Sequence, residues 1–219
     1  LANHSLAPNF TPCITGDQSH PTQACTFPLQ NEHLQIKCVK YWPETEVATY
    51  DKIRVEPLQT DDSTEPVVRT FCISNLAHPE IEPRVITHFQ YREWPDHGLP
   101  GSPTGFLRLV KLVCNVDHGT PIIVHCSAGI GRTGTFCTVH SIICMMIKHF
   151  HFHGVLPPIN IVRTVLNFRD QRPGMVQNKD QYMFCYLSIL QEFTRMQKLA
   201  NQQKQQTNSE PLADPRPII

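Results

Sequence analysis

The sequence lacks an excess of charge of either sign, because 19 Lys and Arg residues balance 19 Asp and Glu residues. A nucleic-acid-binding surface needs a basic excess, so we expect no nucleic-acid partner. A long apolar run is also missing: residues 136–147, the longest, are too short and too polar to span a bilayer. No basic segment followed by an apolar one opens the chain, so we expect neither a membrane segment nor a signal peptide.

Closely spaced cysteine pairs are missing as well. The nine cysteines are odd in number and scattered, and no two of them form a CxxC pair. Zinc sites and disulfide frameworks rely on such pairs, so we expect reduced thiols, no metal and a cytoplasmic location. The tract with His149, His151 and His153 is expected at a fraying helix end, where the rings would diverge, so we assign it no metal role.

What the sequence does contain is a long periodic region between two polar ends. Residues 1–31 are rich in Pro, Ser, Thr and Asn and are expected to be an irregular segment with no assigned role. Residues 198–219 are polar, rich in Gln and interrupted by Pro, which predicts a disordered tail. Residues 32–197 are therefore the expected folded domain.

Within this domain, β-branched and aromatic runs predict strands, and apolar residues at helical spacing predict helices. The expected strands are 46–57, 66–74, 84–94 and 121–125, and the expected helices are 102–116, 131–149, 157–170 and 179–199. Ser102 before Pro103, and Asn178 three residues before Gln181, are typical of helix starts. Strands that lead into helices indicate an α/β fold.

The stretch PIIVHCSAGIGRTGTF, residues 121–136, joins an apolar strand to a helix through a loop of small residues. Gly129 and Gly131 permit backbone conformations that other residues avoid, so successive N–H groups can point into one concavity. The positive N-terminal end of the helix adds to this field, and Arg132 can project two parallel donors into it. The stretch therefore predicts a cradle for a tetrahedral oxyanion such as phosphate.

Cys126 lies at the bottom of this predicted cradle. A cysteine after an apolar strand is most often a small buried hydrophobe, and its spacing from Arg132 decides nothing by itself. The dipoles and charge of the cradle, however, would lower the pKa of the thiol from about 8.5 into the ~3.5–7.5 range and make it a nucleophile. A phosphate loop of the nucleotide-hydrolase type is the rival interpretation, but its GK[ST] signature is missing.

A thiolate that displaces a phosphoryl ester also needs an acid for the leaving oxygen. Asp96 lies on the Trp-Pro-Asp-His-Gly turn of residues 94–98, where Gly98 and Pro100 are suited to bound a mobile loop. Taken alone, Asp96 is a plain turn residue. In the same chain as the cradle, it becomes the candidate general acid.

Four motifs together resemble the tyrosine-specific, cysteine-dependent protein phosphatase family. In chain order they are NEHLQIKCVKYWPE (31–44), WPDHG (94–98), VHCSAGIGRTG (124–134) and QRPGMVQNKDQY (171–182). The resemblance implies a twisted mixed sheet flanked by helices. It also implies hydrolysis of phosphotyrosine in proteins through a phosphocysteine intermediate, with phosphotyrosine proteins as partners and without a cofactor.

The resemblance further implies a role for each matching position. Cys126 attacks phosphorus, and Arg132 binds the equatorial phosphate oxygens. Asp96 protonates the leaving tyrosyl oxygen and then acts as a base toward water. Gln177 and Gln181 position that water, and Asp96 and Gln177 also face the bound substrate.

A second group of positions supports this chemistry. The backbone N–H groups that would bind phosphate belong to Ser127, Ala128, Gly129, Ile130, Gly131 and Arg132. Thr133 supplies a hydroxyl near the sulfur and eases its departure. His125 orders the loop, Glu32 orients Arg132, and Lys37 contacts the acid loop when it closes.

The sequence departs from the family at its front. Residues 1–31 contain no counterpart of the family's Asn-Arg-Tyr recognition loop, its Asp-Tyr-Ile-Asn-Ala-Ser segment or its early apolar strands. The completeness of the sheet at the N-terminal side is therefore open, and a catalytically silent phosphotyrosine-binding or scaffold protein is the alternative function. Dual-specificity phosphatases share the Cys–Arg loop but lack the Trp-Pro-Asp turn and the glutamine loop, and rhodanese-like proteins share less.

Overall fold

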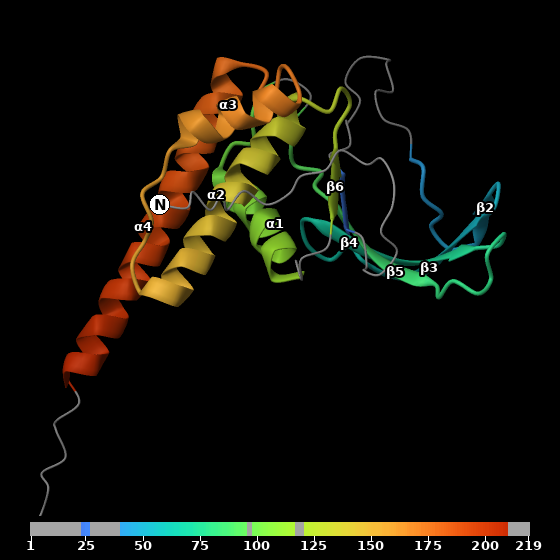
Figure 1. The fold of residues 1–219 in the computed structure, drawn as a ribbon, viewed down its shortest axis with the longest axis horizontal. Coiled ribbons are helices and arrows are strands. Elements are labelled where there is room, and N and C mark those ends of the chain that lie inside the picture. Colours follow the sequence, from blue (N-terminus) through green and yellow to red (C-terminus); the bar gives the residue numbers. More distant parts are fainter. Residues whose placement is uncertain (1–22, 27–39, 96–97, 117–120, 210–219) are drawn as a thin grey trace, which may run out of the picture.

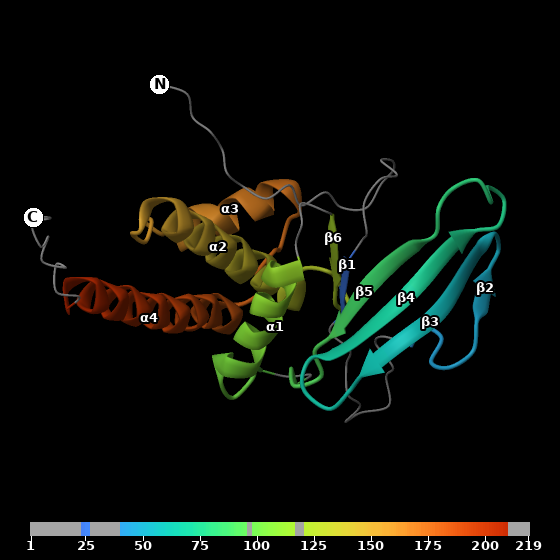
Figure 2. The same ribbon diagram turned by 90° about the horizontal axis from the view of Figure 1, so that it is seen from below.

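The structure, a computed structural model, describes residues 23–26, 40–95, 98–116 and 121–209. Its strands are β1 (Gln23–Thr26), β2 (Ala48–Tyr50), β3 (Ile53–Asp61), β4 (Val67–Asn75), β5 (Arg84–Gln90) and β6 (Ile122–His125). Its helices are α1 (Pro103–Val116), α2 (Gly131–His153), α3 (Ile161–Gln171) and α4 (Lys179–Ser209). The helices lie on the β6 side of the sheet, and β2, β3 and β4 extend away from them (Figure 1 and Figure 2). The predicted α/β class is confirmed.

One sheet joins the strands in the order β2-β3-β4-β5-β1-β6. Neighbours from β2 to β5 are antiparallel, whereas β1 runs parallel to both β5 and β6, so the sheet is mixed as predicted. Thr26 of β1 is in register with Gln90 of β5 on one side and with His125 of β6 on the other. The carboxyl ends of β5 and β6 therefore meet at one edge, where loops of α/β sheets form binding sites.

The expectation that residues 1–31 are irregular is wrong for Gln23–Thr26, which form β1. The tetrapeptide carries no apolar run and no alternation that would identify a strand. It is a strand because it pairs along both edges, so its backbone hydrogen-bonding groups find partners in β5 and β6 whatever its side chains are. β1 is therefore an inner strand of the sheet, on the N-terminal side where the sequence alone leaves the completeness of the sheet open.

The expected disordered tail is also wrong for residues 198–209, because α4 continues through Ser209. Gln, Lys, Leu and Ala favour the helix, and no Pro occurs before residue 211 to end it. The start of α4 agrees with the prediction, since the backbone N–H of Gln181 donates to Oδ1 of Asn178 at 2.8 Å. Residues 210–219 lie outside the described ranges.

The start of α1 agrees with the prediction, whereas the start of α3 differs from it. At α1, the Ser102 hydroxyl accepts from the backbone N–H of Thr104 at 3.2 Å, as the sequence predicts. At α3, the helix begins at Ile161 rather than in the Pro157 region. The side chain of Asn160 accepts from the Arg163 N–H at 2.9 Å, so a hydrogen-bonding cap determines this start.

An aromatic cluster connects the turn before α1 to the helices. Trp94, which is 1% exposed, packs its ring 5.6 Å from that of Phe106 in α1 and 5.4 Å from that of Phe184 in α4. Phe106 also lies 6.3 Å from Phe136 of α2. Burial of rings of this size stabilises a fold by roughly 1.5–3 kcal/mol each. Trp94, two residues before Asp96, is thereby held against α1 and α4, and Phe106 connects it to α2, the helix that follows the cradle.

Candidate active site

The predicted cradle occupies residues 126–130, between the end of β6 and the start of α2. The strand–loop–helix order inferred from the sequence is thus present, with Ser127, Ala128, Gly129 and Ile130 in the loop and Gly131 opening the helix. Gly129 has a φ of +71°, a left-handed conformation that L residues rarely adopt. The first turn of α2 points its free N–H groups into the loop, and these attract an anion.

The Cys126 thiol accepts hydrogen bonds from this cradle. The Thr133 hydroxyl donates to its Sγ at 3.2 Å. Burial would raise the pKa of Cys126, but the Thr133 hydroxyl and the backbone N–H groups of Thr133, Gly129 and Ile130 lower it below its ordinary value. Cys137, in the same helix, is the contrasting case, because burial raises the pKa of its thiol to about 12. Only the first of these environments favours a nucleophile.

Arg132 joins the cradle to the turn that carries the candidate acid. Its side chain is 7% exposed, and its Nη2 donates to the backbone oxygen of Pro95 at 2.8 Å. Pro95 directly precedes Asp96, which itself lies outside the described residues. The carboxyl ends of β5 and β6 thus bring the two predicted motifs together, although 37 positions separate Arg132 from Pro95 in the chain.

The two candidate water-positioning glutamines lie against the beginning of α2. A Cβ added to Gly131 would lie 2.9 Å from Nε2 of Gln181 and 3.1 Å from Oε1 of Gln177. The backbone N–H of Gln177 donates to Oε1 of Gln181 at 2.9 Å, which fixes the orientation of that amide. Both side chains therefore flank the cradle, as the sequence interpretation requires.

The loop that carries Gln177 is fastened to the cradle by contacts that the sequence analysis missed. The Val176 N–H donates to the Ile130 oxygen at 3.1 Å, and the Arg169 guanidinium donates to the oxygens of Met175 and Val176, each at 2.9 Å. Val176 has a φ of 58°, which is strained for a β-branched residue. A Cβ at Gly134 would lie 2.3 Å from the Val176 nitrogen, so this close approach requires glycine.

A further arginine, at the end of α3, donates a hydrogen bond to the cradle. Nη2 of Arg172 donates to the Ala128 oxygen at 3.1 Å. Arg172 stands inside the quoted QRPG stretch, so its motif could have singled it out, whereas nothing local distinguishes Arg169.

His125 connects the cradle to the strand side of the molecule. Its Nδ1 lies 3.3 Å from the Cys126 oxygen, and its Nε2 lies 2.7 Å from the hydroxyl of Tyr41, which sequence reasoning did not assign. Trp42 follows Tyr41 and stacks obliquely on His88 of β5, with ring centroids 4.8 Å apart. Glu32 and Lys37, the other two supporting positions, lie outside the described residues.

The groups around Cys126 suit an anion better than a metal ion. They are a guanidinium, a hydroxyl, amides and backbone N–H groups, all of which donate hydrogen bonds.

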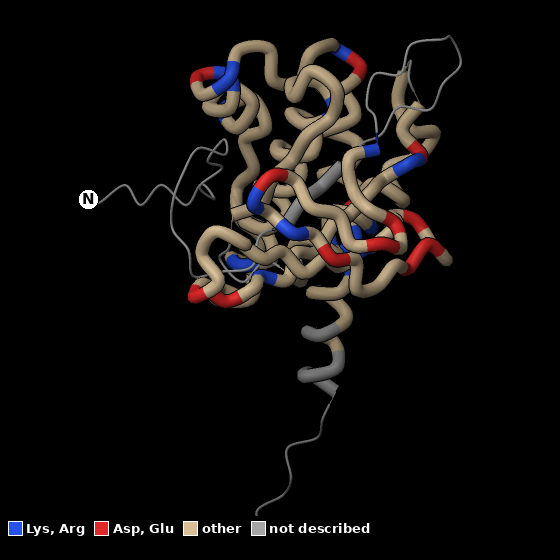
Figure 3. The backbone as a smooth tube through the Cα atoms, turned by 90° about the vertical axis from the view of Figure 1, so that its right-hand side faces the viewer, with Lys and Arg blue, Asp and Glu red and all other residues tan. Residues whose placement is uncertain are grey.

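The histidine tract lies at the other end of α2, which extends through His153. The rings of His149 and His153 lie 4.4 Å apart, so the expectation that the rings of this tract diverge is wrong for these two. Basic and acidic positions occur side by side in several parts of the molecule (Figure 3).

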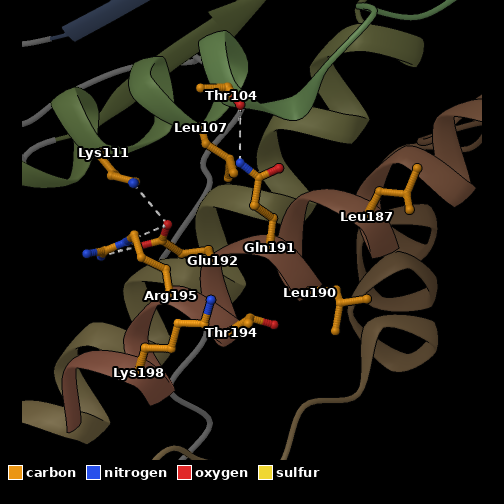
Figure 4. A pocket seen from close by; sticks show the side chains of 10 residues that line it. All are labelled: Thr104, Leu107, Lys111, Leu187, Leu190, Gln191, Glu192, Thr194, Arg195 and Lys198. Carbon is orange, nitrogen blue, oxygen red and sulfur yellow. Dashed lines mark hydrogen bonds and ion pairs between the residues drawn. The ribbon is translucent and has the colours of Figure 1, made fainter. Parts of the chain in front are cut away.

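A separate groove of about 510 Å³ lies between α1 and α4, away from the cradle. Figure 4 shows Lys111 and Arg195 converging on the buried carboxylate of Glu192, with Lys111 Nζ 2.9 Å and Arg195 Nε 3.0 Å from its oxygens. Burial would raise the pKa of Glu192, but these hydrogen bonds outweigh it and lower the pKa. The ion pair from Lys111 to Glu192 therefore links α1 to α4.

No helix in the described ranges is both long and apolar enough to cross a bilayer.

Comparison with known proteins gives one consistent result. Residues 24–191 match the sequence model of the family described as protein-tyrosine phosphatase. The chain is 44% identical over 163 residues to Tyrosine-protein phosphatase 2 of Dictyostelium discoideum, a match that covers 73% of this chain and 42% of that protein. It is 44% identical over 119 residues to Protein-tyrosine-phosphatase PTP1 of Arabidopsis thaliana, covering 54% and 34% of the two chains. It is 35% identical over 169 residues to Receptor-type tyrosine-protein phosphatase epsilon of Rattus norvegicus, covering 74% and 23%.

The chain therefore spans 42% of the first of these relatives and less of the other two. The family match begins at Ala24, inside β1, and ends at Gln191, inside α4. It thus includes β1 apart from Gln23, as well as the cradle, the acid turn and the glutamine loop. On these grounds the chain belongs to the protein-tyrosine phosphatase family.

Proposed function

We propose that this chain hydrolyses phosphotyrosine in proteins through a phosphocysteine intermediate. One observation carries the proposal: the Cys126 thiol, with its lowered pKa, lies at the floor of a cradle of N–H groups at the start of α2. A thiolate in that position faces the phosphorus of any phosphate that the cradle binds. The site needs no metal ion or other cofactor, because Arg132 and the backbone N–H groups supply the positive charge.

In the first step, the Cys126 sulfur forms a bond to phosphorus while the bond from phosphorus to the tyrosyl oxygen breaks. Asp96 gives its proton to that leaving oxygen, so tyrosine departs neutral. Arg132 and the N–H groups of residues 127–132 bind the equatorial oxygens as charge moves onto them. Glu32 orients Arg132, and Lys37 contacts the acid loop when it closes over the substrate.

In the second step, water replaces sulfur on phosphorus. Gln177 and Gln181 hold the water in line, and Asp96, now a carboxylate, takes its proton as the new bond to phosphorus forms. The sulfur leaves as a thiolate, and the Thr133 hydroxyl 3.2 Å from Sγ stabilises it. His125 keeps the loop in shape through its contact with the Cys126 oxygen.

We further propose that residues 32–197 act as the catalytic domain, with β1 completing its sheet, in a reducing compartment such as the cytoplasm. The support for this location is chemical, because the thiolate of a nucleophilic cysteine is lost on oxidation. Proteins that carry phosphotyrosine are the proposed partners.

Hydrolysis of a phosphotyrosine peptide by the purified full chain tests the proposal, with the Cys126→Ser variant alongside. We expect turnover by the unchanged chain and none by the variant, while the variant still binds the peptide. Cys72→Ser, a half-buried thiol on β4, is the matched control and should keep full activity. Turnover by Cys126→Ser near the unchanged rate would mean that the nucleophile is misassigned. Binding without turnover by the unchanged, folded chain would favour the silent phosphotyrosine-binding alternative.

The acid role of Asp96 predicts that its replacement affects substrates with different leaving groups unequally. Asp96→Asn should slow phosphotyrosine hydrolysis by about 10²–10⁴-fold, the usual contribution of a general acid. A phosphate ester with a better leaving group needs less protonation, so its hydrolysis should fall less. Equal losses on the two substrates, measured as kcat, would contradict the assignment.

A further inference from the structure

A cluster of two thiols and one imidazole lies between α1 and α2. Cys114, in the last turn of α1, places its Sγ 2.7 Å from the Sγ of Cys144 in α2. His140, one helical turn before Cys144, places its Nε2 3.5 Å from the same sulfur. His140 and Cys144 are 0% and 8% exposed, whereas Cys114 is half-buried. Cys114 and Cys144 are 30 positions apart in the sequence, so no local pattern indicates that they meet.

The distance between the two sulfurs decides which chemistry the cluster suits. Two thiolates on one tetrahedral zinc ion, each about 2.3 Å from the metal, would lie about 3.8 Å apart. Two sulfurs of a disulfide lie about 2.05 Å apart. The observed 2.7 Å is closer to the second value, so the two helices already hold the thiols near bonding distance. A metal ion would require the two sulfurs to separate by about 1.1 Å, whereas a disulfide requires them to approach by only about 0.7 Å.

We propose that Cys114 and Cys144 are a peroxide-sensitive dithiol that forms a reversible disulfide between α1 and α2, with His140 as the proton acceptor. The cluster is remote from the proposed nucleophile, because α2 rises about 20 Å between residues 131 and 144. The proposal therefore stands apart from the phosphatase activity.

The disulfide forms in two steps and consumes one molecule of peroxide. The sulfur of Cys114, the more exposed thiol, attacks a peroxide oxygen, so an S–O bond forms and the O–O bond breaks. The thiol proton leaves with the departing hydroxide as water, and Cys114 becomes a sulfenic acid. The sulfur of Cys144 then attacks the sulfur of Cys114, so the S–S bond forms and the S–O bond breaks. His140 takes the Cys144 proton and passes it to the departing hydroxide as a second water.

The disulfide would fix the end of α1 that lies away from the acid turn. α1 begins just after that turn, and Phe106 in its first half packs against Trp94. α1 and α2 lie side by side in the helix layer (Figure 1). A covalent link at Cys114 would therefore stabilise the layer on which Trp94 rests, without touching the cradle.

Peptide mapping after treatment with hydrogen peroxide tests the proposal. Trypsin cuts after Lys111, Arg132 and Lys148, so Cys114 and Cys126 share one peptide, and Cys137 and Cys144 share the next. The full chain with Cys126→Ser removes the first ambiguity, and fragmentation of the linked peptides separates Cys137 from Cys144. After free thiols are alkylated, we expect peptides 112–132 and 133–148 joined through Cys114 and Cys144, and separated again by dithiothreitol.

Thermal unfolding of the same samples gives an independent readout. The disulfide should raise Tm by about 5–10 °C, and reduction should reverse the rise. Cys114→Ser should abolish the rise, whereas Cys72→Ser, the matched half-buried thiol on β4, should keep it. His140→Gln should slow formation of the disulfide severalfold without preventing it. An unchanged rate in that variant would remove His140 from the reaction.

Two results would overturn the proposal. One is that Cys114 and Cys144 remain fully alkylated after peroxide has oxidised other thiols of the folded chain. The other is that the reduced chain binds one zinc ion per molecule, loses it in Cys114→Ser, and resists peroxide while zinc is bound. That second result would make the cluster a metal site.

Discussion

The two halves of the sheet differ in how they are covered. β5, β1 and β6 form a parallel half beside the helices, whereas β2, β3 and β4 form an antiparallel ribbon that extends away from them (Figure 2). α2, which follows β6, buries fourteen of its residues, whereas none of the nine residues of β3 is fully buried. The groups proposed for chemistry come from the parallel half and the helices after it.

The difference separates two kinds of contribution to the site. Beside the parallel half, Cys126 and Arg132 belong to the cradle and the start of α2, and Gln177 flanks them, so under the proposed function their geometry decides whether phosphate is bound and attacked. The ribbon half contributes indirectly, because the segment just before β2 carries Tyr41, which contacts His125, and Trp42, which packs on His88 of the neighbouring β5. We therefore expect substitutions in the first half to change activity, and substitutions in the second to change stability first.

Arg132→Lys should have the largest effect on activity. Lysine keeps the charge but loses the fork that donates in parallel to two phosphate oxygens, and the bond to the Pro95 oxygen is lost with it. Loss of one such donor costs about 10²–10³-fold in kcat, so we expect at least that decrease at a nearly unchanged free energy of unfolding. The measurements are kcat on a phosphotyrosine peptide and urea unfolding.

Arg54→Lys is the control from the ribbon. Arg54 is exposed on β3 and pairs with Glu56 at 3.2 Å, so its replacement should leave both quantities unchanged. A similar loss of kcat in both variants would break the distinction between the two halves.

His88 of β5 lies where the two halves meet, against Trp42 and against Phe71 of β4, and should show how this contact with the ribbon affects stability. Burial first, and then the charges of Arg69 and His125, lower the pKa of His88 to about 4, from about 6.5 in the unfolded chain. Its contribution is therefore fully present above pH 6.5 and is lost as the pH falls toward 4, because the unfolded chain takes up the proton first. The loss amounts to roughly 3 kcal/mol.

His88→Gln removes the titrating group, so the free energy of unfolding should fall less steeply between about pH 6.5 and 4. His151→Gln, at an exposed position near the end of α2, serves as the comparison and should keep the original slope. Urea unfolding at several pH values gives these slopes. Equal slopes in His88→Gln and in the unchanged chain would mean that folding leaves the pKa of His88 unshifted.

The cradle could be predicted from the sequence because its parts are local. The residues from Cys126 to Thr133 are contiguous, and glycines, a strand and a helix start determine their geometry over a few positions. The helix starts at Ser102 and Asn178 could be read for the same reason, since each cap lies within three residues of its partner. Structure that depends on interactions between residues close in the sequence can therefore be predicted from a single sequence.

Features that depend on distant pairing could not be predicted in this way. β1 is a strand because β5 and β6 lie on either side of it, and no pattern within four residues can report that. The positive φ of Val176 and the two bonds from Arg169 to its loop likewise arise from packing against Gly134 and Ile130. The helix at residues 198–209 differs from the prediction because its polar composition is also typical of a disordered segment.

Tyr41→Phe should have the smallest effect and sharpens the comparison most. The variant loses one hydrogen bond, 2.7 Å from the Tyr41 hydroxyl to Nε2 of His125, on a side chain that is 49% exposed. Such a bond contributes about 0.5–1.5 kcal/mol net, and exposure favours the lower end, so kcat/KM should fall only about two- to fivefold. Tyr186→Phe, an exposed hydroxyl on α4 that contacts Tyr182, should change nothing measurable. A decrease in Tyr41→Phe as large as that in Arg132→Lys would show that the strand side shapes the cradle as strongly as α2 does, and the two halves would then act as one unit.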